Sequence, residues 1–242
     1  MSSTGTDGAG LELKELEAGY GESMILRDIS LRVKPGQVVC LMGRNGVGKT
    51  TLMKTVMGLI KPRRGSVHYA GRELTASPPD RRAKAGIGYV PQGRDIFPQL
   101  TVEENLLLGL ESTDSRRRKA GIPESVYEQF PVLKQMLQRK GGDLSGGQQQ
   151  QLAIARALVS EPKLLLLDEP MEGIQPSIVM EIERVIERIK ASRSMAVLLV
   201  EQSLTFATSI ANYYYVLDKG TIVAEGSSSA LSEEQVRKHL AV

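Results

Sequence analysis

Residues 43–50 read Gly43-Arg44-Asn45-Gly46-Val47-Gly48-Lys49-Thr50, which fits the phosphate-binding pattern G-x-x-x-x-G-K-[ST]. The run follows the apolar segment 38–42 and precedes a helical pattern, which is the strand–loop–helix order that such a loop requires. Glycines let backbone N–H groups turn toward phosphate oxygens, and the next helix presents its positive end. The sequence therefore predicts a nucleotide phosphate site, in which Lys49 reaches the β- and γ-phosphates and Thr50 ligates Mg²⁺.

The segments around this loop alternate between strand and helix patterns. Several runs have no polar face, as expected of strands buried on both sides of a parallel sheet, and these are residues 38–42, 87–90, 164–167 and 196–200. Apolar residues recur at helical spacing over residues 178–189, while residues 11–16 and 29–33 alternate as strands. We predict an α/β fold with a P-loop (RecA-like), mostly parallel sheet core and an antiparallel β part.

The alternation stops between residues 93 and 160, which read as helices and loops and include a capping box at Thr101 and Glu104. We interpret residues 93–160 as an inserted helical subdomain. The predicted organisation is a flexible leader (1–10), an ATP-binding α/β core (11–92 and 161–226), the helical subdomain, and a short C-terminal helix (227–242) that opens at Ser232 and Gln235.

Composition limits the class of protein. Among 242 residues, 31 Lys+Arg stand against 28 Asp+Glu, so the net charge is +3, too small a surplus to argue for nucleic-acid binding. The single cysteine, Cys40, excludes an internal disulfide framework. No apolar run approaches the roughly 18–20 residues that span a bilayer. We expect a globular, cytosolic chain.

A second candidate site is the acid pair Asp168 and Glu169, which ends the apolar run 164–167. A P-loop nucleotidase needs an acid at a strand end to hold Mg²⁺, and a group that orients or deprotonates water. Asp168 suits the metal and Glu169 the water. Acids also commonly terminate buried strands, and only the neighbouring phosphate loop makes the functional interpretation the stronger one.

A third motif, Leu144-Ser145-Gly146-Gly147-Gln148, opens a helical run that continues to residue 157. Ser145 is a good N-cap and the two glycines leave backbone amides open, so this helix start is a second anion site. Because residues 43–50 already serve the γ-phosphate, the second site points to a nucleotide held by a partner subunit. A plain capped helix is the alternative.

The run LSGGQ at residues 144–148 resembles the signature of the ABC-type ATPases, and the resemblance covers nearly all of residues 11–225. It implies ATP and Mg²⁺ as ligands and head-to-tail pairing of two subunits. Each ATP would then lie between the phosphate loop of one subunit, extended here to Thr51, and the signature residues of the other. Those residues are Ser145, Gly146, Gly147 and Gln148.

The same resemblance assigns roles to single residues. Tyr20 is similar to the aromatic residue that stacks on adenine. Gln92, in Val90-Pro91-Gln92, is similar to the glutamine that ligates Mg²⁺ and senses the transmembrane partner. Asp168 matches the metal-binding acid and Glu169 the catalytic base.

Residues 86–97, 100–106 and 200–202 resemble a bacterial importer subgroup that serves branched-chain amino acid and urea uptake, and residues 172–177 resemble its urea branch. The resemblance implies an ATP-hydrolysing subunit of an importer for urea or short-chain amides, with branched-chain amino acids as the alternative. Separate transmembrane permease subunits would hold the chain on the inner face of the cell membrane. A periplasmic solute-binding protein would act with it indirectly.

Three residues depart from the family pattern. Gln202 replaces a histidine that contacts the γ-phosphate, Gln175 replaces an aspartate that couples the two sites, and Met171 replaces a threonine. An amide can hydrogen-bond phosphate but cannot take a proton as imidazole can. We therefore predict that Gln202 belongs to the catalytic site. We also expect the chain to form a heterodimer with a related ATP-binding subunit, a homodimer being possible.

Two other classes of function remain open. A weakly hydrolysing regulatory ABC module is favoured by Gln175 and Gln202 and opposed by Glu169. An ABC ATPase that acts on nucleic acid or ribosomes is disfavoured, because the chain shows neither coiled-coil arms nor a second cassette.

Overall fold

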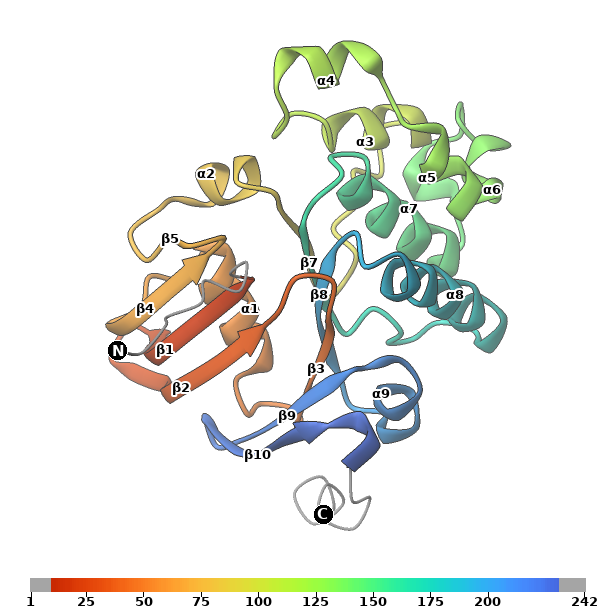
Figure 1. The fold of residues 1–242 in the computed structure, drawn as a ribbon. Helices are drawn as coiled ribbons and strands as arrows, with labels where there is room; N and C mark the ends of the chain where they lie inside the picture. Colours follow the sequence, from red (N-terminus) through yellow and green to blue (C-terminus); the bar gives the residue numbers. More distant parts are fainter. Residues whose placement is uncertain (1–9, 231–242) are drawn as a thin grey trace.

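The computed structural model describes residues 10–230, and its strands form two sheets (Figure 1). The larger sheet has the order β10-β9-β3-β8-β7-β6. Its parallel strands are β9 (Tyr213–Asp218), β3 (Val38–Met42), β8 (Ala196–Glu201), β7 (Leu164–Asp168) and β6 (Ile87–Val90). At one edge β10 (Thr221–Ser227) pairs antiparallel with β9. The predicted α/β fold with a mostly parallel sheet is confirmed.

The smaller sheet is antiparallel, in the order β2-β1-β4-β5. Its strands are β1 (Leu11–Tyr20), β2 (Ser23–Val33), β4 (Arg64–Tyr69) and β5 (Arg72–Glu73). Alternate residues of β1 and β2, such as Leu13 and Leu31, are buried in one cluster with Leu52 of the helix that follows the phosphate loop. This packing confirms the predicted antiparallel part and joins it to the main sheet.

Within residues 10–230, four helices lie outside the segment between β6 and β7, namely α1 (Lys49–Met57), α2 (Pro79–Lys84), α8 (Pro176–Ser192) and α9 (Leu204–Ile210). The helix α8 buries Ile182, Val185, Ile186 and Ile189, which confirms the stripe expected from the sequence. It begins at Pro176, whose missing N–H costs nothing at a first helical position.

The segment between β6 and β7 is helical and lies at the top right of Figure 1. It contains α3 (Val102–Leu108), α4 (Ser115–Ala120), α5 (Glu124–Gln129), α6 (Pro131–Lys134), the 3₁₀ turn η1 (Gly141–Asp143) and α7 (Gly146–Leu158). The predicted capping box is confirmed, since Thr101 Oγ1 accepts from the Glu104 backbone N–H and the Glu104 carboxylate accepts from that of Thr101. The domain boundaries at residues 93 and 160 stay a prediction.

At the other end of the chain, β10 continues to Ser227 and a 3₁₀ turn, η2 (Ser228–Ala230), follows. Ser232 and Gln235, the residues expected to open a C-terminal helix, lie outside the described residues, as does most of the predicted leader. Between residues 10 and 230 no helix combines the length and the apolar character needed to cross a membrane.

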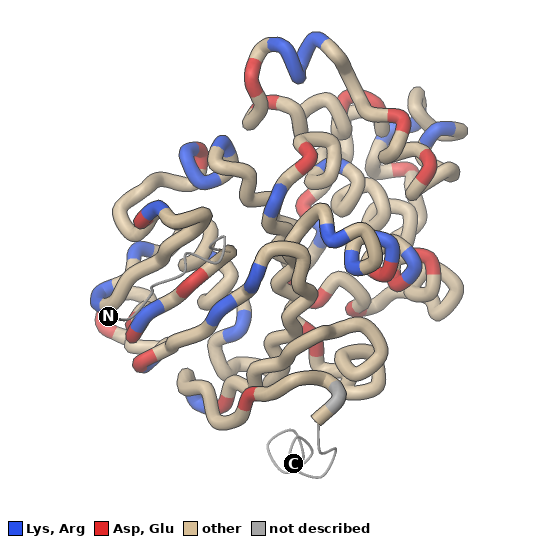
Figure 2. The backbone as a smooth tube through the Cα atoms, in the orientation of Figure 1, with Lys and Arg blue, Asp and Glu red and all other residues tan. Residues whose placement is uncertain are grey.

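Charged residues of both signs are interspersed along most elements, as Figure 2 shows. The longest basic run, in α4, lies at the tip of the helical segment, away from the phosphate loop. Its members pair locally, Arg117 with Glu161 at 3.0 Å and Arg118 with Glu111 at 3.2 Å. This run therefore reads as a solvated helix face and supports no separate binding site.

Candidate functional site

The phosphate loop connects β3 to α1, so the loop amides and the helix start face the same space. Gly48 is the N-cap of α1 and has φ +113°, a conformation that residues with a Cβ rarely adopt. A Cβ at this position would also lie 2.9 Å from Leu26 Cδ2. Only glycine therefore lets the chain turn from the strand into the helix here.

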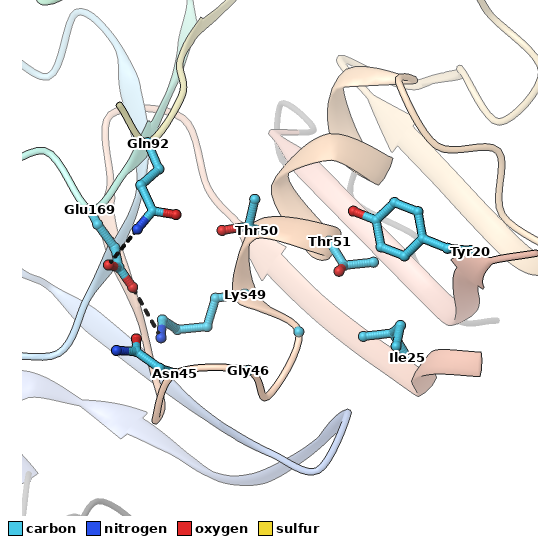
Figure 3. A pocket seen from close by; sticks show the side chains of 10 residues that line it. Tyr20, Ile25, Asn45, Gly46, Lys49, Thr50, Thr51, Gln92 and Glu169 are labelled. Atoms are coloured by element: carbon cyan, nitrogen blue, oxygen red, sulfur yellow. Dashed lines mark hydrogen bonds and ion pairs between the residues drawn. The ribbon is translucent and has the colours of Figure 1, made fainter. Parts of the chain in front are cut away.

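A cavity of about 340 Å³ lies over this loop (Figure 3). It brings together half of the residues predicted for the nucleotide, and its lining comprises Tyr20, Ile25, Asn45, Gly46, Gly48, Lys49, Thr50, Thr51, Gln92 and Glu169. Tyr20 is 50% exposed, and with Ile25 it forms an open, partly apolar end of the cavity. A purine base would find a stacking surface there, beside the polar end that suits phosphates. Gly43, Arg44 and Val47 do not line the cavity.

Lys49 is nearly buried, and its side chain stays within the loop. The Nζ atom donates to the carbonyl oxygens of Gly43 and Arg44, both at 2.8 Å, and lies 3.1 Å from Glu169 Oε1. The ammonium group thus has three anionic or dipolar partners where a phosphate would bind. The structure places Lys49 at the cavity with Glu169 as its counter-ion, and its contact with phosphate stays a prediction.

The carboxylate oxygens of Asp168 have the features of cation ligands. It is 1% exposed, and neither carboxylate oxygen has a hydrogen-bond partner among the described residues. Burial raises the pKa of Asp168 to about 6, an effect that the Thr50 side chain partly offsets and the Glu169 charge adds to. A buried, unpartnered carboxylate beside a hydroxyl fits Mg²⁺, which prefers such oxygen ligands.

Glu169 lies at a turn out of β7 and has φ +48°, an unusual conformation for a residue with a side chain. Its carboxylate collects donors from three elements. Lys49 Nζ and Gln202 Nε2 contact Oε1 at 3.1 and 3.0 Å, and Gln92 Nε2 contacts Oε2 at 3.3 Å. The left-handed backbone at this turn thus directs the predicted base into the cavity, where its two oxygens meet all three donors.

Gln202 directly follows β8, and its side chain hydrogen-bonds both the phosphate loop and the acid pair. Its Nε2 atom donates to Asn45 Oδ1 at 2.7 Å as well as to Glu169. Both amide hydrogens are therefore engaged, and contact with a phosphate oxygen requires that one of them be released. Gln202 thus lies between the phosphate loop and Glu169, and its contact with phosphate stays a prediction.

The signature residues do not line this cavity. Ser145 caps α7 through a capping box, in which its hydroxyl accepts from the Gln148 N–H and the Gln148 side chain accepts from the Ser145 N–H. A Cβ at Gly147 would lie 2.8 Å from Ile178 Cγ1 of α8, so close helix packing also requires this glycine. The predicted second anion site therefore lies apart from this chain's own phosphate loop.

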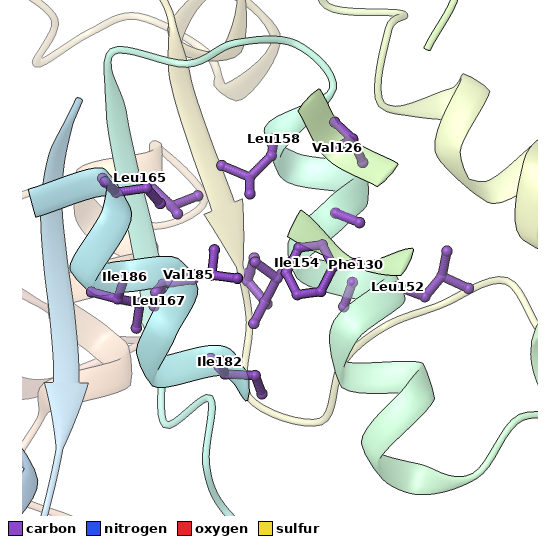
Figure 4. Packing of buried hydrophobic residues seen from close by; sticks show 14 of the residues in the cluster. Val126, Phe130, Leu152, Ile154, Leu158, Leu165, Leu167, Ile182, Val185 and Ile186 are labelled. Atoms are coloured by element: carbon purple, nitrogen blue, oxygen red, sulfur yellow. The ribbon is translucent and has the colours of Figure 1, made fainter. Parts of the chain in front are cut away.

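The signature helix is fixed to the acid-bearing strand by apolar packing (Figure 4). Leu152 and Ile154 of α7 share one buried cluster with Ile182 of α8 and Leu167 of β7. Leu167 immediately precedes Asp168. Because packed interiors deform little, α7, α8 and the strand that carries the acid pair form one closely packed unit.

Two acidic residues near the site were not singled out by the sequence. Glu201, the last residue of β8, is buried, and burial raises its pKa to about 7 while backbone N–H groups of Gln202 and Met171 lower it. Glu172 accepts a hydrogen bond from Gln92 Nε2 at 2.8 Å. For Glu201 a signal was present, because an acid at the end of an apolar strand is the pattern that marked Asp168.

Gln175 and Met171, which depart from the expected pattern, lie in the loop that follows the acid pair. Gln175 is the N-cap of α8, although its side chain makes no capping hydrogen bond. Met171 is partly buried against the main core cluster. Its thioether therefore packs where the family's threonine would present a hydroxyl.

The chain is similar to proteins of a known family and of known structure. The sequence profile of the family described as "ABC transporter" matches residues 26–172. A high-affinity branched-chain amino acid transport ATP-binding protein of Pseudomonas aeruginosa is 42% identical, over 91% of this chain and 94% of that protein. A lipopolysaccharide export system ATP-binding protein of Acidithiobacillus ferridurans is 34% identical, over 93% of this chain and 92% of that protein. A solved dimeric ATP-binding cassette, bound to ADP and phosphate, is 25% identical over 91% of this chain and 100% of that chain, with a TM-score of 0.80. The chain therefore belongs to the ABC transporter family, as an ATP-binding subunit that hydrolyses ATP.

Proposed function

We propose that the chain supplies ATP hydrolysis to an importer of small polar solutes, in the first place branched-chain amino acids. The observation that carries this choice is the 42% identity to the Pseudomonas aeruginosa amino acid transport protein, against 34% to the export protein. The loop at residues 172–177 keeps urea as the second candidate, since that loop resembles the urea branch. Separate permease subunits would hold the chain at the inner face of the cell membrane, with a periplasmic solute-binding protein on the other side.

We expect uptake of labelled leucine by proteoliposomes that contain the chain, its permease subunits and the solute-binding protein. Labelled urea in a parallel assay tests the second candidate directly. Complexes carrying Lys49→Ala serve as the control for ATP-independent leakage. Uptake of neither solute above this control would contradict the importer proposal.

The roles of the site residues follow from their positions. Loop amides of residues 43–50, together with Lys49, hold the phosphates, and Tyr20 stacks on the base. Thr50, Asp168 and Gln92 would hold Mg²⁺, which would supply positive charge to offset the negative charge of the phosphates. Glu169 accepts the proton of the attacking water.

The contacts that Glu169 makes with Lys49 and Gln202 suggest a switch in the proposed cycle. Lys49 Nζ and Gln202 Nε2 both contact Oε1 of Glu169, so this oxygen is already occupied by two donors. A bound γ-phosphate offers Lys49 a second, more highly charged anion, and the same phosphate competes for the amide of Gln202. When Lys49 and Gln202 turn from Glu169 to the γ-phosphate, the Glu169 carboxylate becomes free while ATP is bound.

Full activity in this proposal requires a second ATP-binding subunit. The signature residues Ser145–Gln148 do not line the cavity over the phosphate loop, and the similar solved cassette is a dimer. Gln202 and Gln175 weaken the site on this chain's own phosphate loop, while a related partner with histidine and aspartate would complete the other site. We therefore propose a heterodimer of two ATP-binding subunits on two different permease subunits.

We expect the isolated chain to bind Mg-ATP but to turn it over slowly, and a mixture with its partner subunit to be faster at equal total concentration. Steady-state phosphate release measures both rates, and sedimentation measures pairing. Gln202→His should raise the rate of the chain alone, because imidazole can take part in proton transfer. Equal rates for the chain and the mixture, with no gain from Gln202→His, would contradict the asymmetric pair.

A further inference from the structure

The side chain of Gln92 is held by two carboxylates that follow the neighbouring strand. Its Nε2 atom donates to Glu172 Oε2 at 2.8 Å and to Glu169 Oε2 at 3.3 Å. Gln92 comes two residues after β6, and both acids follow β7, which pairs with β6 in parallel. The parallel register, with Val90 opposite Leu167, therefore brings residues 80 positions apart into contact.

The two carboxylates determine which end of the Gln92 amide faces the expected cation site. An ionised carboxylate only accepts hydrogen bonds, whereas an amide has one end that donates and one that accepts. With Nε2 between Glu169 and Glu172, the oxygen of Gln92 must point the other way, and in Figure 3 it lies on the side of the Thr50 hydroxyl. A flipped amide would place its oxygen against two carboxylates and its N–H groups toward the cation.

The two carboxylates contribute differently to this orientation. Glu169 also pairs with Lys49 and Gln202, and it loses or changes these contacts when it acts as the base. Glu172 makes the shorter contact with Gln92 and has no part in the proposed proton transfer. Glu172 is exposed, so its replacement removes little buried surface.

We propose that Glu172 is a positioning residue, which holds the carbonyl oxygen of Gln92 toward the divalent cation of the nucleotide site. This rests on the proposed function, in which Gln92 is a ligand of that cation. Because Glu172 lies in the loop that leads to Gln175 and α8, the cation ligand from β6 is tied directly to the loop that follows the acid pair.

The discriminating variant is Glu172→Gln, since an amide of the same size can donate to Gln92 as well as accept from it. The orientation of Gln92 is then favoured only by the longer contact with Glu169. We expect the Kd for Mn²⁺, measured by electron paramagnetic resonance on the chain saturated with a non-hydrolysable ATP analogue, to rise about fivefold, the factor of one ordinary hydrogen bond. Affinity for the analogue without divalent cation should be unchanged. Glu187→Gln, the same charge change at an exposed position of α8, should leave both constants as in the parent.

A double-mutant cycle separates orientation from simple loss of charge. In a Gln92→Ala background, Glu172→Gln should no longer change the Kd for Mn²⁺, because no amide remains to be oriented. A fivefold effect that persists in that background, or no effect in the parent, would overturn the proposal. If Gln92→Ala alone leaves the Kd unchanged, Gln92 is not a cation ligand and the positioning role falls with it. A parent chain that binds no Mn²⁺–nucleotide would contradict the proposed function itself.

Discussion

Glu169→Gln is expected to reduce steady-state ATP turnover by about 10²–10⁴-fold, the range that a general base contributes. An amide of nearly the same shape keeps the side chain in the cavity but cannot accept a proton from water. The same change removes the ion pair that holds Lys49 at 3.1 Å, so the ammonium is free to meet phosphate. We therefore expect binding of a non-hydrolysable ATP analogue to be at least as tight as in the parent.

The measurements are phosphate release at saturating Mg-ATP and equilibrium binding of the analogue. Glu187→Gln is the matched control, because it makes the same change on an exposed face of α8. Turnover within about twofold of the parent would remove Glu169 from the role of base, given the size of effect that such a base has. Loss of analogue binding would show instead that the carboxylate organises the nucleotide site.

Lys49→Ala is expected to weaken ATP binding by about 10- to 150-fold, the equivalent of the 1.5–3 kcal/mol typical of a hydrogen bond to a charged group. The lost ammonium group is the only side-chain cation lining the described cavity. Its removal also leaves the Glu169 carboxylate, 7% exposed, without its counter-ion. Turnover should fall below detection for both reasons.

Lys49→Met separates these effects, since it keeps the apolar stem and removes only the charge. Lys49→Arg tests geometry, because a planar guanidinium does not reproduce a compact ammonium group at this enclosed position. Lys61→Ala, at an exposed position after α1, is the control for loss of a basic residue. ATP affinity of Lys49→Met equal to that of the parent would contradict the assignment of the phosphate loop.

Local sequence was sufficient for the elements whose requirements lie within a few residues. The turn at Gly48 needs a left-handed backbone, and the capping box at Thr101 and Glu104 closes within one helical turn. The apolar runs of β3, β7 and β8, together with the stripe of α8, likewise appear in contiguous residues. For the same reason the phosphate loop and the acid pair were found without any structure.

Elements that depend on distant pairing were not predicted. The strand β9 carries three consecutive tyrosines, and its place in the sheet comes from parallel pairing with β3, in which Tyr214 lies opposite Cys40. The strand β4 is placed by antiparallel pairing with β1, about fifty residues earlier. A periodic pattern states which side of a strand is buried, but it does not name the strand that will cover it.

The sequence by itself determined the chemistry at each strand end, namely the ammonium group of Lys49, the two acids that follow β7, and the amides of Gln92 and Gln202. Only the tertiary structure decided that these groups meet at one carboxylate, with Lys49, Gln92 and Gln202 all donating to Glu169. The same holds for the contact between Gln92 and Glu172. The physical reason is that a parallel sheet places the ends of strands from remote parts of the chain at one edge, and the register that aligns them is set by side-chain packing across the whole core.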